Sequence, residues 1–200
     1  MPIYDKLARF YDAAFSPFEK RFLNRWRAET ISLLPNDGTI LEIGCGTGAN
    51  FELYPTNCDA VSSELSIKML EFASKKLVGN KLVQANAESL PFEANSFDAA
   101  FATLVFCSIP DPAKAFVELR RVLKPKANLI LLEHVRPPGS LGYAFDVLNV
   151  ITTALIDDHF NRKTAEIAAQ AGFEIVEVRQ KAAGAVNLIV CAEVATARNS

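Results

Sequence analysis

The stretch Leu41-Glu42-Ile43-Gly44-Cys45-Gly46-Thr47-Gly48-Ala49-Asn50 decides the fold class of this 200-residue chain. It begins with an apolar run that predicts a buried strand and continues into a turn that opens a helix. Glycine lets the backbone turn tightly and approach a ligand with no Cβ in the way. The N–H groups at the start of a helix favour an anionic group. Three glycines in this position predict a ligand-binding turn, and a tight turn without a ligand is the alternative.

Polar residues after the next two predicted strands point to a nucleoside. Glu64 ends the second predicted strand, where a carboxylate can accept hydrogen bonds from two ribose hydroxyls. Asn86 and Ala87 follow the third predicted strand, where a side-chain amide and exposed backbone can recognise the edge of an adenine. These residues predict a cofactor that contains adenosine. Gly44-x-Gly46-x-x-Ala49 also satisfies the looser dinucleotide pattern, so a nicotinamide cofactor stays an alternative.

Short β-rich runs alternate with helical stretches along the middle of the chain, which is typical of βαβ units. The last two runs are close enough in sequence to form an antiparallel hairpin. We therefore predict an α/β, Rossmann-like fold: a seven-stranded, mostly parallel sheet with helices on both faces and an antiparallel last strand. The predicted strands are 39–43, 59–62, 81–85, 97–103, 128–133, 173–179 and 185–194, and the main predicted helices are 49–54, 66–76, 113–123 and 162–171.

Composition and charge exclude several classes of protein. The net charge of −2 leaves no basic field for nucleic acid, so no nucleic-acid partner is expected. The four cysteines lack metal-binding or redox spacing, and His159 with Asp157 and Asp158 does not by itself make a metal site. The chain has no apolar run of about 18 residues and no secretion signal at its start. We expect one cytoplasmic domain over residues 1–200, and the sequence does not indicate its oligomeric state.

The motifs, taken together and in this order, resemble those of the class I S-adenosylmethionine-dependent methyltransferases. The similar segments are 40–50, Glu64, 86–92, 96–100 and 122–125, and the resemblance is dense over residues 38–135. Glu64 stands where Asp is equally common, and Asn86 stands where Asp is usual. A carboxylate still suits ribose, and an amide oxygen can still accept from the adenine amino group.

Further segments resemble small methyltransferases that act on apolar acceptors. Residues 46–51, 54–55, 103–108 and 133–135 are similar to the animal membrane-associated thiol methyltransferases, without their long hydrophobic N-terminal anchor. The opening Tyr4-Asp5-x-x-Ala8-x-x-Tyr11-Asp12 resembles bacterial quinone- and phospholipid-modifying methyltransferases. The resemblance implies methyl transfer from S-adenosylmethionine to a small or lipid-like acceptor, such as a thiol, a quinone or a phospholipid. An NAD-dependent oxidoreductase and a non-catalytic cofactor-binding module are the alternatives.

The resemblance also implies roles for individual residues. Gly44 and Gly46 are expected to hold the methionine end of the cofactor, and Glu42 its α-amino group. Glu64 is expected to bind the ribose. The other expected contacts are Leu65 on the adenine face, Asn86 and Ala87 at its edge, and the backbone of Thr103 and Leu104 beside the methionine portion.

Two segments that lie outside the strand–helix alternation are expected to enclose the acceptor: an N-terminal helical lid, 1–35, and a substrate lid, 136–161. Tyr4 is expected to contact the cofactor, and Tyr11 to close over the sulfonium as a catalytic residue, with simple packing as the alternative for both. His134 ends the fifth predicted strand and is expected to act as a general base, or else to be hydrogen-bonded to a loop.

The N-terminal lid also combines basic and aromatic side chains. This pattern predicts either peripheral contact with a membrane surface or a core-packed helix with a solvated basic face. The basic residues are Lys20, Arg21, Arg25 and Arg27, and the aromatic residues beside them are Phe18, Phe22 and Trp26.

Overall fold

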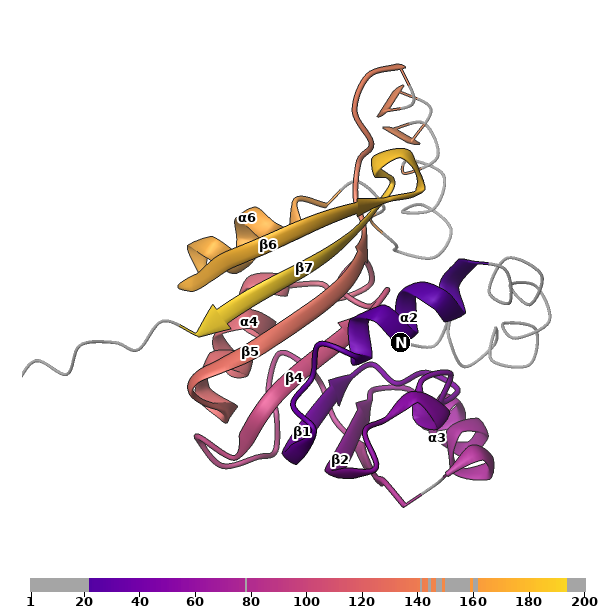
Figure 1. The fold of residues 1–200 in the computed structure, drawn as a ribbon, viewed down its shortest axis with the longest axis vertical. Coiled ribbons are helices and arrows are strands. Elements are labelled where there is room, and N and C mark those ends of the chain that lie inside the picture. Colours follow the sequence, from indigo (N-terminus) through magenta and orange to yellow (C-terminus); the bar gives the residue numbers. More distant parts are fainter. Residues whose placement is uncertain are drawn as a thin grey trace, which may run out of the picture.

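A seven-stranded sheet forms the centre of the protein, with strand order β3-β2-β1-β4-β5-β7-β6 (Figure 1). The computed structural model describes residues 22–77, 79–140, 142–143, 145–146, 149, 159 and 162–193. Strands β3, β2, β1, β4 and β5 pair in parallel, and β7 lies antiparallel between β5 and β6. The predicted fold class is confirmed, including the reversed last strand. The strands are β1 (Asp37–Ile43), β2 (Asn57–Glu64), β3 (Lys81–Gln84), β4 (Phe97–Thr103), β5 (Leu123–His134), β6 (Phe173–Lys181) and β7 (Val186–Glu193).

Helices lie on both faces of the sheet. Helix α2 packs on one face, and α4 and α6 pack on the other. Alternate residues of the central strands supply the two cores: Phe101 and Ile130 face α2, whereas Ala100 and Leu129 face α4. Burial on both sides explains why these strands are nearly continuous apolar runs. The helices are α2 (Asn24–Ile31), α3 (Ile67–Ala73), α4 (Pro112–Val122) and α6 (Thr164–Gln170), with short 3-10 turns at Phe51–Leu53, Ser74–Lys76 and Ala182–Gly184.

Side-chain caps begin two of these helices. The Met69 N–H donates to Ser66 Oγ at 3.2 Å, so the Ser66 side chain caps the start of α3. The Lys114 N–H donates to Asp111 Oδ1 at 3.1 Å, and Pro112 occupies the first turn of α4. These residues satisfy donors that would otherwise lack partners at a helix start.

Two predicted elements differ from the structure. Residues 49–54 form only the 3-10 turn Phe51–Leu53, because Pro55 follows at once and leaves no room for an α-helix. Strand β5 begins at Leu123 rather than at residue 128, because Leu123 pairs with Phe97 and Lys124 bonds to Asp98 at 2.6 Å. Tertiary pairing extends this strand through Pro125, where the sequence alone indicates a break.

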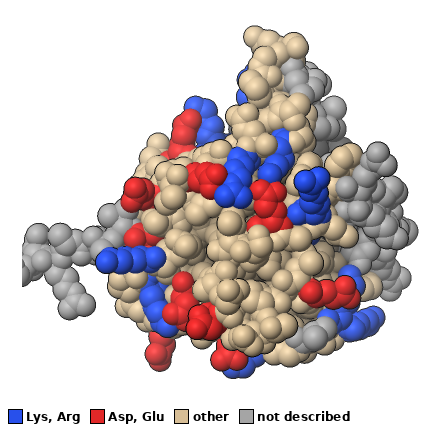
Figure 2. Space-filling model, viewed as in Figure 1, with Lys and Arg blue, Asp and Glu red and all other residues tan. Residues whose placement is uncertain are grey.

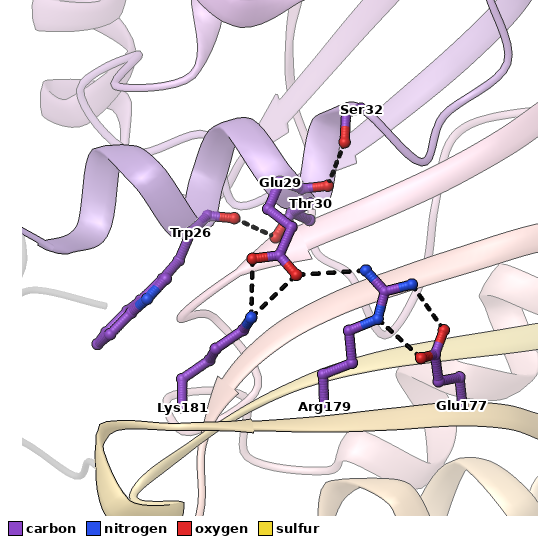
Figure 3. A network of polar contacts seen from close by, with 7 residues as sticks. All are labelled: Trp26, Glu29, Thr30, Ser32, Glu177, Arg179 and Lys181. Carbon is purple, nitrogen blue, oxygen red and sulfur yellow. Dashed lines mark hydrogen bonds and ion pairs between the residues drawn. The ribbon is translucent and has the colours of Figure 1, made fainter.

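Ion pairs connect α2 to the far edge of the sheet (Figure 3). Glu29 on α2 lies 2.7 Å from Lys181 Nζ and 3.2 Å from Arg179 Nη1, both on β6. Arg179 also pairs with Glu177 at 2.8 Å. Elsewhere on the face drawn in Figure 2, positive and negative side chains are interspersed rather than gathered into a field of one sign.

Candidate functional site

The strand order reverses between β1 and β4, and the site lies at the carboxyl ends of these two strands. Ligands of open α/β sheets bind at such a switch point, because the loops diverge there and leave a crevice. Ile43 pairs with Ala102, so Gly44 and Thr103 follow at the same level of the sheet. The glycine turn after β1 therefore faces the end of β4, as the sequence predicts.

The three glycines of the turn have positive φ angles of 65°, 55° and 80° at Gly44, Gly46 and Gly48. A Cβ on Gly44 would lie 2.6 Å from Val105 Cγ1, and one on Gly48 would lie 2.6 Å from the ring of Phe51. Packing explains these two glycines. A Cβ on Gly46 would meet no atom of the described residues within 4 Å, so these residues leave the backbone there open. Open backbone at the centre of the turn is what a bound ligand requires.

Glu64 holds its carboxylate against this open turn. Oε2 accepts the Gly46 N–H at 3.1 Å, and Oε1 accepts the Ser66 N–H at 2.8 Å. Burial raises the pKa of the Glu64 carboxyl, and these two N–H donors oppose the shift. The next residue, Leu65, is 40% exposed although it is apolar. A carboxylate and an exposed apolar side chain, the two features predicted to contact ribose and adenine, thus follow one another at the end of β2.

The predicted adenine-edge residues lie on a turn beside this surface. Asn86 is exposed, and its Oδ1 accepts the Glu88 N–H at 3.0 Å. Ala87 is partly buried against the core. The Ala85 N–H donates to the Glu64 carbonyl at 3.0 Å, which keeps this turn next to the end of β2.

A buried polar network lies behind the glycine turn. Arg27 Nη1 donates to Thr103 Oγ1 at 2.7 Å and to Asn50 Oδ1 at 3.1 Å. Asn50 Nδ2 in turn donates to Glu42 Oε1 at 2.5 Å, and the Tyr54 hydroxyl donates to Glu42 Oε2. Burial raises the pKa of the Glu42 carboxyl, and these donors oppose the rise. Both oxygens of the predicted amino-group partner therefore already accept a protein hydrogen bond.

The sequence reasoning missed Arg27, Asn50 and Tyr54 as parts of the site. Arg27 is only 6% exposed, so its predicted place on a solvated or membrane-facing basic surface is wrong. Arg25, on the same helix, is exposed. Two residues along a helix correspond to a rotation of about 200°, so one arginine reaches the sheet while the other faces solvent. The positions of the two arginines around the helix axis could have predicted this difference from the sequence.

The end of β4 is conformationally unusual. Leu104 has φ +59°, which is rare for a residue other than glycine, and its N–H donates to the Leu132 carbonyl at 2.7 Å. Glu133 Oε1 then accepts the N–H groups of Val105 and Phe106 at 3.0 and 3.1 Å. A buried carboxylate thus fixes the loop opposite the glycine turn. Backbone strain of this kind is concentrated at functional sites.

His134 lies at the carboxyl end of β5, partly buried beside the start of β7. Burial lowers the pKa of its imidazole to about 4, and a hydrogen bond to the Ala185 backbone opposes this shift. His134 is therefore neutral near pH 7 and accepts a proton only weakly.

The remaining predicted features lie partly or wholly outside the described residues. Tyr4 and Tyr11 are outside them, as is most of the predicted substrate lid. Where that lid returns to the sheet, the His159 N–H donates to the Cys107 carbonyl at 3.0 Å. Arg162 Nη1 donates to the Phe106 carbonyl at 2.9 Å, so this part of the chain contacts the loop after β4.

Metal sites and membrane spans are both absent from the part of the chain that the structure describes. No group of three or more His, Cys, Asp or Glu side chains among these residues could hold a metal ion. No helix within the same ranges is both long and apolar enough to cross a bilayer.

Comparisons with known proteins agree with this geometry. A family model described as "Methyltransferase domain" matches residues 41–131. The thiol S-methyltransferase TMT1B of Rattus norvegicus is 33% identical over 72% of this chain and 63% of that protein. The ubiquinone/menaquinone biosynthesis C-methyltransferase UbiE of Citrobacter koseri is 29% identical over 93% of this chain and 87% of that protein. The crystal structure of a Thermotoga maritima SAM-dependent methyltransferase superposes with a TM-score of 0.76 at 25% identity, over 96% of this chain and 98% of that one.

The fold and the turn define a Rossmann-like protein with a nucleoside-cofactor site. With these matches, the chain belongs to the class I S-adenosylmethionine-dependent methyltransferases, which confirms the resemblance seen in its sequence. The chain spans 63%, 61% and 62% of the length of the rat, mouse and human TMT1B proteins.

Proposed function

We propose that this protein transfers a methyl group from S-adenosylmethionine to a small apolar thiol. The observation that carries the proposal is the open backbone at Gly46, bordered by the Glu64 carboxylate and the exposed Leu65. The carboxylate suits the hydroxyls of a ribose, the apolar side chain suits a base, and the open backbone leaves room for the rest of the cofactor. When bound, the cofactor supplies a methyl group on a sulfonium, which already carries its own good leaving group.

The residues present fit such a cofactor. Glu64 would accept the ribose hydroxyls in place of the Gly46 and Ser66 N–H groups, and Leu65 would cover one face of the adenine. The turn at Asn86 and Ala87 would border the adenine edge. Gly46 and Thr103 would line the methionine end. The main task of the chain is then to hold the acceptor in line with the methyl group and to exclude water.

The lowered pKa of His134 favours a thiol acceptor over an alcohol or a phenol. A hydroxyl acceptor needs a base that removes its proton, and an imidazole with a pKa lowered to about 4 is a poor base at neutral pH. A thiol is a stronger acid than an alcohol and its sulfur is intrinsically more nucleophilic, so a thiol acceptor depends less on a protein base. The similarity to TMT1B, named a thiol S-methyltransferase, supports the same choice. The base role predicted for His134 and the closing role predicted for Tyr11 stay predictions.

A quinol is the second candidate acceptor. The similarity to UbiE, named a ubiquinone/menaquinone biosynthesis C-methyltransferase, extends over 93% of this chain. Methylation at a ring carbon of a quinol requires ionisation of its hydroxyl, so this candidate requires a stronger base than His134.

An acceptor panel tests the proposal. The purified protein would be incubated with S-adenosylmethionine and an alkanethiol, hydrogen sulfide, a naphthoquinol or phosphatidylethanolamine vesicles, and S-adenosylhomocysteine would be measured by mass spectrometry. We expect acceptor-dependent product with the thiols. Product with the quinol alone would support the second candidate. Cofactor binding without product for any acceptor would support a non-catalytic module.

A further inference from the structure

The turn that borders the predicted adenine edge, residues 86–89, is closed on itself. The Ser89 N–H donates to the Asn86 carbonyl at 2.9 Å, and the Glu88 N–H donates to Asn86 Oδ1 at 3.0 Å. Asn86 and Ser89 are exposed to solvent. These bonds make the turn a compact unit, so its place in the site depends on the groups to which it is attached.

Leu90 attaches this turn to the core. It is 5% exposed and packs in the apolar core that faces α4. Buried backbone groups require hydrogen-bond partners. The Leu90 N–H donates to Glu118 Oε2 at 2.7 Å, and its carbonyl accepts from Arg121 Nη2 at 2.9 Å. Two side chains of α4 therefore supply the bonds that a neighbouring strand supplies within a sheet.

Glu118 and Arg121 are also bonded to each other. Arg121 Nε donates to Glu118 Oε1 at 2.8 Å, and Arg121 Nη2 donates to Oε2 at 2.8 Å. A guanidinium and a carboxylate joined by two bonds have a fixed relative geometry. The bond from Arg121 lowers the pKa of the Glu118 carboxyl, which is therefore charged near pH 7. Arg121 Nη1 also donates to the Phe92 carbonyl at 2.7 Å, so the pair holds the backbone on both sides of Leu90.

A second contact holds the turn at the start of α4. Glu88 Oε1 accepts the N–H of Asp111, the residue that caps this helix, at 2.9 Å. Asp111 and Glu118 are about two helical turns apart. Two attachments separated along one helix fix the orientation of the turn as well as its position. Phe116 and Leu119 anchor the helix itself in the core.

We propose that Glu118 and Arg121 are positioning residues that set the selectivity of the site for adenine. They act through the backbone of Leu90, which fixes the turn at the edge of the base. This role rests on the proposed cofactor function and adds to it the residues that determine base selection. Recognition of a base edge requires polar groups held to within about 0.5 Å. A displaced turn would lose these contacts, whereas the contacts of Glu64 with the ribose depend on β2 and would remain.

Calorimetric titrations with two ligands test this role. S-adenosylhomocysteine and S-inosylhomocysteine share the ribose and the amino-acid end, but the amino group of adenine is a carbonyl oxygen in the second ligand. The wild-type protein should bind the adenosyl ligand about tenfold more tightly, as expected when one hydrogen bond at the base edge is lost. Arg121→Gln should reduce this preference to about threefold or less and change the affinity for the inosyl ligand by less than about twofold.

Arg120→Gln is the matched control on the same helix. Arg120 Nη1 donates to the Ala171 carbonyl at 3.1 Å, and Arg120 Nη2 lies 3.6 Å from Glu193 Oε1 on β7. The control therefore removes similar bonds that do not involve the adenine turn. It should keep the wild-type preference even if urea unfolding shows a loss of stability. An unchanged preference in Arg121→Gln, including equal losses of affinity for both ligands, would overturn the inference.

Glu118→Gln is a milder variant that decides the question if Arg121→Gln does not fold. The amide keeps an acceptor for the Leu90 N–H but weakens the bonds to Arg121, so the preference should fall about twofold to fivefold. An unchanged preference in this variant would also overturn the inference. A wild-type protein that binds both ligands equally would overturn base selection by the turn and leave the proposed function intact. A wild-type protein that binds neither ligand would overturn the proposed function itself.

Discussion

At the scale of single residues, three glycines with similar backbone angles have different reasons to be glycine. A side chain at position 44 would collide with Val105, and one at position 48 with Phe51. Among the residues that the structure describes, position 46 has no such neighbour, although its φ of 55° is still unfavourable for other residues. Packing selects the outer two glycines, and the ligand space that we propose selects the middle one.

Gly46→Ala should therefore weaken cofactor binding more than it weakens the fold. The added methyl group enters the open space, and the positive φ costs about 1 kcal/mol of stability. Gly79→Ala is the matched control, since Gly79 has φ +75° and an added Cβ there would also meet nothing within 4 Å. Both variants should lose similar stability in urea unfolding, and only Gly46→Ala should lose affinity for S-adenosylhomocysteine. Equal affinities for the two variants would contradict a ligand over Gly46.

Glu64→Gln should reduce affinity for S-adenosylhomocysteine by about tenfold to hundredfold. The amide keeps the size of the side chain but removes the charged acceptor for the ribose hydroxyls, which is worth about 1.5–3 kcal/mol. Calorimetry gives the dissociation constants, with Asp59→Asn on the exposed side of the same strand as the control. An unchanged dissociation constant would contradict a role for Glu64 in binding the cofactor.

At the scale of secondary-structure elements, α2 connects the site to the last two strands. On one side of this short helix, Arg27 bonds to the polar network behind the glycine turn. Another polar side chain of the helix, Glu29, bonds to Lys181 and Arg179 on β6 (Figure 3). The helix has eight residues and would be marginal alone, so these contacts and the apolar core determine where it lies.

Glu29→Gln should destabilise the protein near pH 7 and lose this effect in acid. The hydrogen bond to Lys181 and the pairing with Arg179 lower the pKa of Glu29 below its usual value of 4.5. Their contribution is therefore present above about pH 4.5 and disappears as the pH falls through the lowered pKa. The side chain is partly exposed, so we expect at most about 1 kcal/mol, measured by urea unfolding at pH 7 and pH 3.

The control for Glu29→Gln is Glu166→Gln on α6, which removes an exposed ion pair with Lys163. We expect a smaller change there, because both side chains stay largely in water. A loss of stability in Glu29→Gln that is the same at both pH values would show that the ion pairs are not its source.

At the scale of the whole molecule, the pH dependence of turnover should follow the ionisation of the acceptor thiol rather than that of a protein side chain. The pKa of His134 is lowered to about 4, so its imidazole stays neutral between about pH 6 and 8. The thiolate fraction of an alkanethiol rises about tenfold per pH unit in this range, and the rate below saturation should rise with it. Rates with two thiols of different pKa should level off at two different pH values. A bend near about pH 6.5 shared by both thiols would instead indicate a titrating protein group.

The sequence alone determined the order of strands and helices, the glycine turn and the position of the acid that follows it. These features depend on local chemistry: apolar runs form buried strands, and positive φ angles favour glycine. Strand β4 was predicted with its observed bounds, Phe97–Thr103. Residue spacing was sufficient because each of these signals is contained within a few neighbouring positions.

Only the tertiary structure decided which polar side chains are buried together. Arg27, Asn50 and Thr103 come from three separate parts of the chain, and they meet because β1 and β4 are neighbours and α2 packs across them. The early start of β5 likewise depends on pairing with β4 across the sheet. Burial and charge pairing are set by contacts between residues far apart in sequence, so local patterns predicted the glycine turn but not the buried arginine behind it.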